Sequence, residues 1–173
     1  MGEFAEMQAA DLASAVSVVA ARLPADTTVV GVVGYSFGAR SALLLAMGNP
    51  RVRALVSLDG GIGTATGVES LRQASSYAAE AELPPVLHFY ERLDSFMLPE
   101  FSLLRSLRTP SLTLREVHHV RHAQFTTYGL ATARLPGLAA AMHAGPATAE
   151  SLREVLEEAR HFLERHLRSA ARG

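Results

Sequence analysis

The sequence contains no cysteine, and this absence removes several classes of function. Without thiols the chain cannot form disulfides, use a thiolate nucleophile or hold zinc through sulfur ligands. An excess of charge of one sign is also missing. The formal net charge of -1 gives no electrostatic argument for binding nucleic acid or an anionic membrane surface. What remains is an ordinary globular composition, with 49% hydrophobic and 19% charged residues.

Long hydrophobic runs are lacking too. No apolar stretch approaches the length needed to cross a bilayer, so we expect no membrane span. The first residues include Glu3 and Glu6 rather than the basic residues that open a secretory signal. We therefore expect a soluble protein and place it in the cytoplasm. A length of 173 residues suits one domain, residues 1–173, with its own hydrophobic core.

Residues 27–48 predict a strand, a tight turn and a helix in direct succession. The run Val29–Val33 is β-branched apart from one glycine and predicts a buried strand. The turn sequence Gly34–Gly38, G-Y-S-F-G, then leads into a helical run rich in alanine and leucine. A G-x-S-x-G sequence in this context predicts a strained turn that projects the Ser36 hydroxyl. We expect glycine on both sides of it because a Cβ would collide with the strand or the helix.

The stretch VGVVGYSFGARSALLLA, residues 30–46, resembles the nucleophile elbow of the α/β-hydrolases, most closely the branch similar to dienelactone hydrolases and acetylhydrolases. The resemblance implies a nucleophile at Ser36 and an oxyanion-hole donor in the backbone N–H of Phe37. In that family the second donor comes from a loop that precedes the elbow and that this sequence does not contain. The resemblance therefore covers only the C-terminal part of the fold, and we expect a partial α/β-hydrolase domain lacking the N-terminal strands.

The remaining chain alternates between helix and strand. We expect helices over residues 4–23, 37–47, 68–81 and 100–107 and a last helix capped by Ser151 and Glu154, and strands over 27–35, 52–58, 86–90 and 112–120. Residues 125–142 are apolar but broken by Gly and Pro, so they predict short helical pieces that would wall a pocket for an apolar acyl group. The alternation predicts right-handed crossovers and an α/β fold, a parallel sheet flanked by helices.

A serine hydroxyl needs a general base, and three histidines follow the last predicted strand or lie in it. We take His122 as the base, because it falls in the loop and because His122-x-x-Phe125 is similar to the histidine segment of the family. His118 and His119 fall within the strand and are the alternatives. The spacing of His118 and His122 would suit a metal pair on a helix, but the segment predicts strand and loop. We expect neither a metal nor a cofactor.

The acid that orients the base is less well defined. The family resemblance implies a position in the loop after the third predicted strand, where Asp94 is the first choice. Glu91 replaces the glycine usual at the start of this loop and is the second candidate. Asp59, at the end of the second predicted strand, is the third, since some hydrolases carry the acid there.

Two functions follow from these residues. The first is a serine hydrolase acting on a small-molecule carboxylic ester or lactone through a Ser36–His122–Asp94 triad and an acyl-enzyme. The second is a non-catalytic hydrolase-like domain, or a fragment, that needs a partner chain to complete the fold and the oxyanion hole. Residues 28–33 would form an open sheet edge, and such an edge pairs readily with another strand. We therefore expect a homodimer or a missing N-terminal half.

Overall fold

Four parallel strands form the centre of the structure, a computed structural model that describes residues 2–24 and 26–170. The strands are β1 (Val30–Tyr35), β2 (Val52–Leu58), β3 (Val86–Tyr90) and β4 (Leu112–Glu116), and they lie side by side in chain order. Each neighbouring pair is parallel. The predicted α/β class with a parallel sheet is confirmed.

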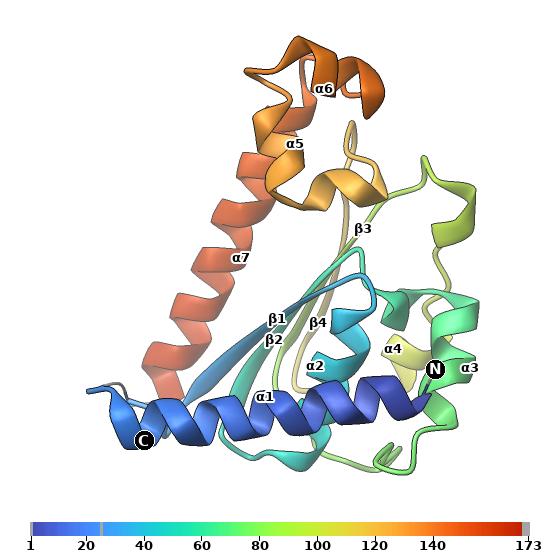
Figure 1. Cartoon of the computed structure of the whole chain (residues 1–173). Coiled ribbons are helices and arrows are strands. Elements are labelled where there is room, and N and C mark those ends of the chain that lie inside the picture. Colours follow the sequence, from blue (N-terminus) through green and yellow to red (C-terminus); the bar gives the residue numbers. More distant parts are fainter. Residues whose placement is uncertain (1, 25, 171–173) are drawn as a thin grey trace.

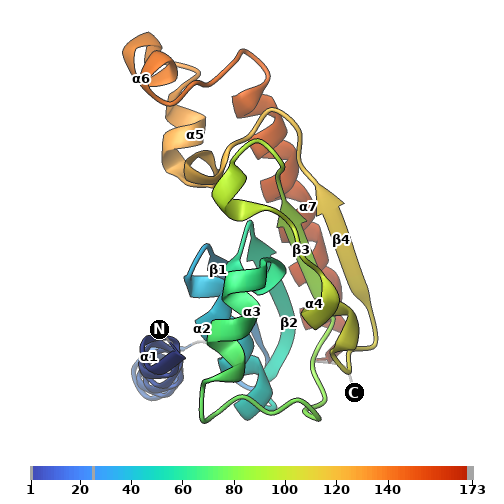
Figure 2. The same ribbon diagram turned by 90° about the vertical axis from the view of Figure 1, so that its right-hand side faces the viewer.

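Helices cover both faces of this sheet (Figures 1 and 2). One face carries α1 (Gly2–Arg22), α2 (Gly38–Gly48), α3 (Ala65–Arg72) and α4 (Ser102–Ser106), and the other carries α7 (Thr148–Ala170). Two short helices, α5 (Thr127–Ala131) and α6 (Pro136–Ala141), lie beyond the C-terminal ends of the strands (Figure 1). Buried side chains fill both layers, with Leu43 and Leu55 among those under α2 and Phe89 and Leu152 among those under α7.

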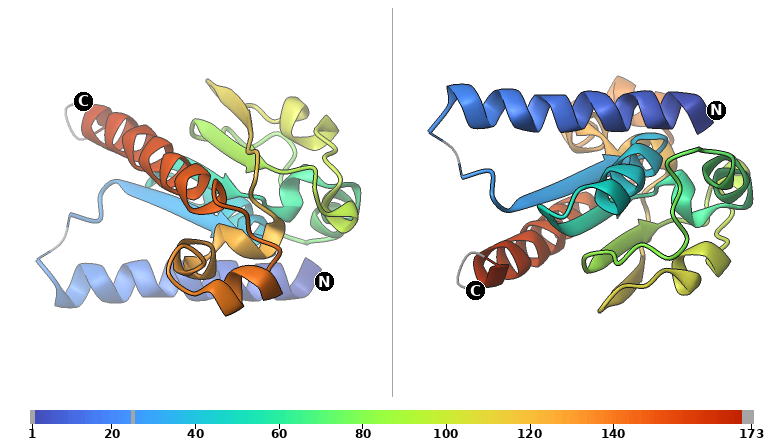
Figure 3. Two further views of the ribbon diagram at one scale, coloured as in Figure 1. Left: turned by 90° about the horizontal axis from the view of Figure 1, so that it is seen from above. Right: turned by 90° about the horizontal axis from the view of Figure 1, so that it is seen from below.

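Strand β1 is an edge of the described sheet, as predicted. It pairs with β2 on one side, and Val33 is 51% exposed. A groove of about 470 Å³ separates this edge from α1, and its lining includes Leu12, Val16 and Val19 of the helix. Figure 3 shows α1 lying on this side of the molecule. The groove therefore presents an apolar wall beside the unpaired edge of β1.

Helix α1 forms where expected but turns a different face inward. Its apolar residues predict a buried stripe that includes Phe4 and Leu12, but both of these are exposed, whereas the small side chains of Ala5 and Ala9 are buried. Gln8, which interrupts that stripe, accepts a hydrogen bond from Ser41 Oγ of α2 at 2.8 Å. By length and composition α1 is also apolar enough to cross a membrane, contrary to our expectation, but signal sequences and core helices share that property.

Several element boundaries differ from the prediction. Helix α3 ends at Arg72 rather than near residue 81, and β4 ends at Glu116 rather than at residue 120. Helix α7 begins at Thr148, ahead of the predicted cap. The Thr148 hydroxyl accepts from the N–H of Gly145 at 3.1 Å and donates to the carbonyl of His119 at 2.8 Å. The bond to Gly145 is local, and the bond to His119 is a tertiary contact that supports a helix start ahead of the one that the local sequence indicates.

Candidate active site

Ser36 lies in a strained turn between the end of β1 and the start of α2. Its φ of 52° is in the left-handed region, which costs a non-glycine residue free energy. The neighbouring strand end holds this conformation: the N–H of Ser36 donates to Leu58 O at 3.2 Å, and its carbonyl accepts from the N–H of Gly61 at 3.0 Å. The turn is thus fixed by hydrogen bonds to the last residue of β2 and to the segment that follows it.

One of the two motif glycines is sterically required. A Cβ on Gly34 would lie 2.5 Å from Ala39 Cα, so β1 could not approach α2 as closely with any other residue. A Cβ on Gly38 would meet nothing within 4 Å, and the expectation that both glycines avoid a collision is wrong there. Gly60, after β2, is required instead, because its Cβ would lie 2.2 Å from Ala39 Cβ.

The structure brings Ser36, His122 and Asp59 together in one chain of hydrogen bonds. Ser36 Oγ lies 2.8 Å from His122 Nε2, and His122 Nδ1 lies 2.7 Å from Asp59 Oδ2. A carboxylate can only accept, so Nδ1 carries the proton and Nε2 of the neutral ring accepts from the hydroxyl. The side chains of His122 and Asp59 are 12% and 3% exposed, which leaves the carboxylate shielded from water.

Asp59 reaches the ring because it directly follows β2 in the same left-handed conformation as Ser36. Its φ is 43°, a region that aspartate tolerates better than most residues. Its N–H donates to Phe89 O at 2.9 Å, and its Oδ1 accepts from the N–H of Glu91 at 3.2 Å. Since neighbouring parallel strands end at the same edge of the sheet, Ser36 and Asp59 emerge side by side.

Asp94, our first choice for the acid, does not meet the imidazole ring. Its Oδ2 accepts from the backbone N–H of His122 at 2.9 Å, and its Oδ1 accepts from Arg121 Nη1 at 2.8 Å. The cause is Glu91, whose buried carboxylate accepts from the N–H groups of Leu93 and Asp94 and so folds the loop back on itself. The carboxylate at the ring is that of Asp59.

Glu91, the second candidate, is also directed away from the ring. Its carboxylate is used within its own loop, and burial raises its pKa above the ordinary glutamate value. A carboxyl group in such a site binds its proton more readily than one in water. This makes it a structural element of the loop rather than a partner of His122.

Two aromatic rings hold the imidazole in place. Tyr35 stacks on His122 with the ring centroids 5.0 Å apart, and its hydroxyl donates to the His122 carbonyl at 3.0 Å. Burial raises the pKa of the Tyr35 phenol, and the negative charges of Asp59 and Asp94 add to the effect. Phe96 meets the ring edge-on at 5.4 Å and is itself 66% exposed. Sequence reasoning missed Tyr35, although it directly precedes the predicted nucleophile.

The other predicted site residues fall around this cluster. Phe37 has helical backbone angles and directly precedes α2, where N–H groups have no intrahelical acceptor. His118 is exposed and lies 3.8 Å from Glu116 through Nδ1, away from Ser36. The apolar segment 125–142 forms α5 and α6, and a hollow of about 520 Å³ beside it is lined by Leu130, Leu135 and Arg153 rather than by Ser36 or His122.

A second serine–histidine pair lies within the sheet. Ser57 Oγ of β2 and His88 Nδ1 of β3 are 2.9 Å apart, and both residues are almost fully buried, at 0% and 1% exposed. Burial lowers the pKa of His88 to about 3, so this ring stays neutral. A Cβ on Gly63 would lie 2.2 Å from His88 Nε2, which shows how closely the backbone covers the other ring nitrogen.

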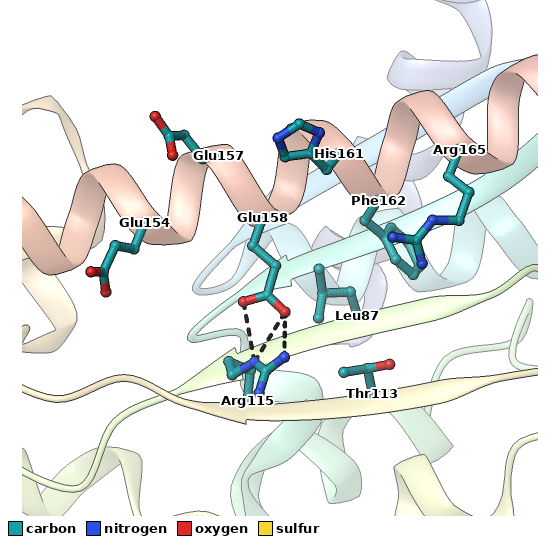
Figure 4. A pocket seen from close by; sticks show the side chains of 9 residues that line it. All are labelled: Leu87, Thr113, Arg115, Glu154, Glu157, Glu158, His161, Phe162 and Arg165. Atoms are coloured by element: carbon teal, nitrogen blue, oxygen red, sulfur yellow. Dashed lines mark hydrogen bonds and ion pairs between the residues drawn. The ribbon is translucent and has the colours of Figure 1, made fainter.

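A hollow of about 530 Å³ lies between β4 and α7 (Figure 4). Arg115 donates to Glu158 across it at 2.7 and 3.0 Å, with the arginine largely exposed. An exposed ion pair of this kind contributes roughly 0–1 kcal/mol to stability. The hollow contains none of the residues of the Ser36 cluster.

The parallel sheet with helices on both faces, and a serine at the end of a strand, define an α/β-hydrolase-like fold. A family model for the dienelactone hydrolase family matches residues 3–117, and the chain belongs to that family. The match includes Ser36, Asp59 and Asp94 and ends before His122. A comparison with curated proteins gave no match.

Solved structures with a similar fold include a hydrolase and an esterase domain. An S-formylglutathione hydrolase from Agrobacterium tumefaciens is 19% identical with a TM-score of 0.47, and the match covers 60% of this chain and 46% of that one. The esterase domain of a Rhodothermus marinus protein is 15% identical with a TM-score of 0.44, and the match covers 65% of this chain and 57% of that one. Wild-type AbyA5 is 20% identical with a TM-score of 0.47, and the match covers 87% of this chain and 51% of that one. The chain thus spans about half the length of these proteins.

Proposed function

We propose that this chain is a serine hydrolase of carboxylic esters or lactones, with Ser36 as nucleophile, His122 as general base and Asp59 as the orienting acid. The observation that carries the proposal is the continuous contact from Ser36 Oγ to His122 Nε2, 2.8 Å, and from His122 Nδ1 to Asp59, 2.7 Å. Membership of the dienelactone hydrolase family supports the reaction class. The strained turn at Ser36 would serve as the nucleophile elbow.

The proposed reaction has two halves. Ser36 Oγ attacks the acyl carbonyl carbon while His122 Nε2 takes the hydroxyl proton. The same proton passes to the alkoxide oxygen as the ester bond breaks, which leaves an acyl group on Ser36 and releases the alcohol. His122 then takes a proton from water, whose oxygen attacks the acyl-enzyme, and returns that proton to Ser36 as the acid departs. Asp59 keeps Nδ1–H directed away from Ser36 and stabilises the positive ring.

The choice of Asp59 over Asp94 rests on the ring contact. An acid acts by fixing the tautomer and orientation of the imidazole, and only a group at Nδ1 can do both. Asp59 is at Nδ1, whereas Asp94 lies on the backbone N–H of His122. Burial favours the role further, because a shielded carboxylate interacts more strongly with the imidazolium than one in water.

The oxyanion hole would be half-built by this chain alone. We assign one donor to the backbone N–H of Phe37, next to the nucleophile. A second donor would come from a segment before β1 or from a partner. Because loss of one donor costs roughly 10²–10³ in rate, we expect slow turnover by residues 1–173 on their own.

Hydrolysis of p-nitrophenyl acetate tests the assignment. The wild-type chain is expected to release p-nitrophenol above the buffer rate, and Ser36→Ala is expected to abolish the excess. Ser57→Ala is the matched control, because it removes a second serine that contacts a histidine and leaves Ser36 intact. An equal rate in Ser36→Ala and wild type would refute the proposal.

The alternative, a domain that needs a partner chain, is favoured by one observation. Strand β1 is an open edge beside an apolar groove, and an added strand would continue the sheet there. The partner would be a second copy or a preceding segment of a longer protein. Sedimentation should then show a dimer that Val33→Lys weakens, and a monomer at micromolar concentration would count against a homodimer. We further propose a cytoplasmic location, which cell fractionation would test.

A further inference from the structure

One short loop contacts both side chains that complete the Ser36 cluster. The loop Glu91–Asp94 follows β3, and its first N–H, that of Glu91, donates to Asp59 Oδ1 at 3.2 Å. Its last side chain, Asp94, accepts the backbone N–H of His122 at 2.9 Å. One end of the loop therefore contacts the proposed acid, Asp59, and the other end contacts the proposed base, His122.

The loop is itself rigidly closed by a buried carboxylate. Glu91 is 0% exposed, and its carboxylate accepts from the N–H of Leu93 and, at 3.0 Å, from the N–H of Asp94. A buried carboxylate without such donors would be strongly destabilising, so the three groups are fixed relative to one another. The direction of the Asp94 side chain depends on this closure.

The Arg121 side chain links the Leu93–Asp94 end of the loop to the segment that contains His122. Arg121 Nη1 donates to Asp94 Oδ1 at 2.8 Å and to the carbonyl of Leu93 at 3.1 Å. The N–H of Arg121 in turn donates to the side chain of Gln124, which is buried. The two oxygens of Asp94 thus bind two successive residues, Arg121 by its side chain and His122 by its backbone.

We propose that Glu91 and Asp94 are positioning residues that set the distance between His122 and its two partners. The proposal rests on the function proposed above. Asp94 fixes the backbone from which the imidazole projects, and Glu91 fixes both Asp94 and, through its own N–H, the orientation of Asp59. Neither touches the reacting atoms. A displacement of about 1 Å in such a site can cost roughly 10²-fold in rate, which is enough to make the loop essential to turnover.

The test compares Asp94→Asn with Asp26→Asn. Asp26 also accepts from a backbone N–H, that of Thr28, and lies in an exposed turn outside the cluster, so it controls for the general loss of a loop hydrogen bond. We measure the rate constant for covalent labelling of Ser36 by a fluorophosphonate and the KM and kcat for p-nitrophenyl acetate. Asp94→Asn should lower the labelling rate and kcat about 10–100-fold with KM within about threefold. Asp26→Asn should match wild type.

Glu91→Gln provides the second arm, with Glu100→Gln as control because Glu100 caps Ser102 in the same way. Glutamine offers one acceptor oxygen in place of two, so the loop should loosen and kcat should fall as in Asp94→Asn. The double variant Glu91→Gln/Asp94→Asn should lose little more kcat than either single variant, because both changes disrupt the same set of hydrogen bonds around the loop. If Glu91→Gln fails to fold, the Asp94→Asn variant alone tests the proposal, because Asp94 is partly exposed and its replacement disturbs the fold less.

Proton NMR separates this proposal from the proposed function. The Nδ1–H of His122 should give a downfield resonance that Asp59→Asn abolishes. If the loop positions both partners, Asp94→Asn shifts or broadens that resonance and Asp26→Asn does not. An unchanged resonance together with a wild-type labelling rate in Asp94→Asn would overturn the positioning role. Absence of labelling in the wild type would refute the hydrolase instead, and the resonance would still report on the loop.

Discussion

Two serine–histidine contacts among the described residues are nearly equal in length, and they differ in almost everything else. Ser36 and His122 approach to 2.8 Å at the C-terminal edge of the sheet, whereas Ser57 and His88 approach to 2.9 Å inside it. The first pair has a carboxylate at the second ring nitrogen, and the second pair has the backbone of Gly63 close to it. A short contact alone therefore does not define a nucleophile.

The difference lies in where each serine stands on its strand. Ser57 is an ordinary residue of β2, paired in register with His88 of β3, so its hydroxyl stays in the layer between sheet and helices. Ser36 follows β1 in a left-handed conformation that lifts it out of the strand. The strain stored at Ser36 is absent at Ser57. The comparison can be sharpened by four changes, given in order of their expected effect.

Replacing the two histidines should separate the pairs most clearly. His122→Ala removes the proposed base and should lower kcat by at least about 10⁴-fold, as expected when one member of a triad is lost. His88→Asn keeps a polar atom facing Ser57 and should leave kcat within about threefold of wild type. Both rates are measured with p-nitrophenyl acetate. Equal losses of kcat in His122→Ala and His88→Asn would contradict the view that only the Ser36–His122 pair takes part in catalysis.

The carboxylate is the next difference between the pairs. Asp59→Asn preserves shape but removes the acceptor that fixes the Nδ1–H tautomer, so kcat should fall about 10³–10⁴-fold. The fall should exceed that of Asp94→Asn, whose carboxylate meets the backbone instead. Single-turnover acylation of both variants provides the measurement. A larger loss in Asp94→Asn would return the acid role to that residue.

Acid should destabilise the protein through the buried pair. The folded-state pKa of His88, about 3, lies below the unfolded value near 6.5, so the unfolded chain binds the extra proton first. The stabilisation is complete above about pH 6.5 and is lost as the pH falls toward 3, by about 1.4 kcal/mol per pH unit. Urea titrations from pH 7 to pH 4 should show this slope, and the difference from His88→Asn isolates it. If the free energy of unfolding depended on pH in the same way for wild type and His88→Asn, the account of His88 as a neutral buried ring would be wrong.

The smallest effect is expected at the buried serine. Ser57→Ala leaves His88 Nδ1 without its partner and should lower the free energy of unfolding by about 1–3 kcal/mol. Turnover of folded protein should be unchanged. Thermal unfolding and the esterase assay on the same sample check both parts. A loss of turnover without a loss of stability would give Ser57 a role that its burial does not predict.

Most of the strands and the helix after Ser36 could be predicted from the sequence, because each is specified by a local pattern. β-branched runs and the G-x-S-x-G turn specify β1, β2, β3 and the helix after Ser36 through patterns a few residues long. The contact between Ser36 and His122 is not local, and its prediction depended on the loop position of His122 and on the family resemblance of His122-x-x-Phe125. Helix α1 was harder, because which face is buried depends on α2 and the groove rather than on its own periodicity.

The acid could not be chosen from sequence for a related reason. Asp59, Glu91 and Asp94 all follow strand ends, and pattern alone does not say which carboxylate will use its oxygens on its own loop. Glu91 does so because it is buried, and this redirects Asp94 to the backbone of His122. The decisive fact is a tertiary one. One signal was available: Asp59 is followed by two glycines, which allow its segment to lie against the Ser36 turn.

The most direct measurement is the position of a fluorophosphonate adduct on the intact chain. After labelling, digestion and mass spectrometry, the account predicts one modified residue, Ser36, with labelling lost in His122→Ala and kept in His88→Asn. Labelling at Ser57, or no labelling of folded wild-type protein, would contradict the claim that the strained turn after β1 carries the nucleophile.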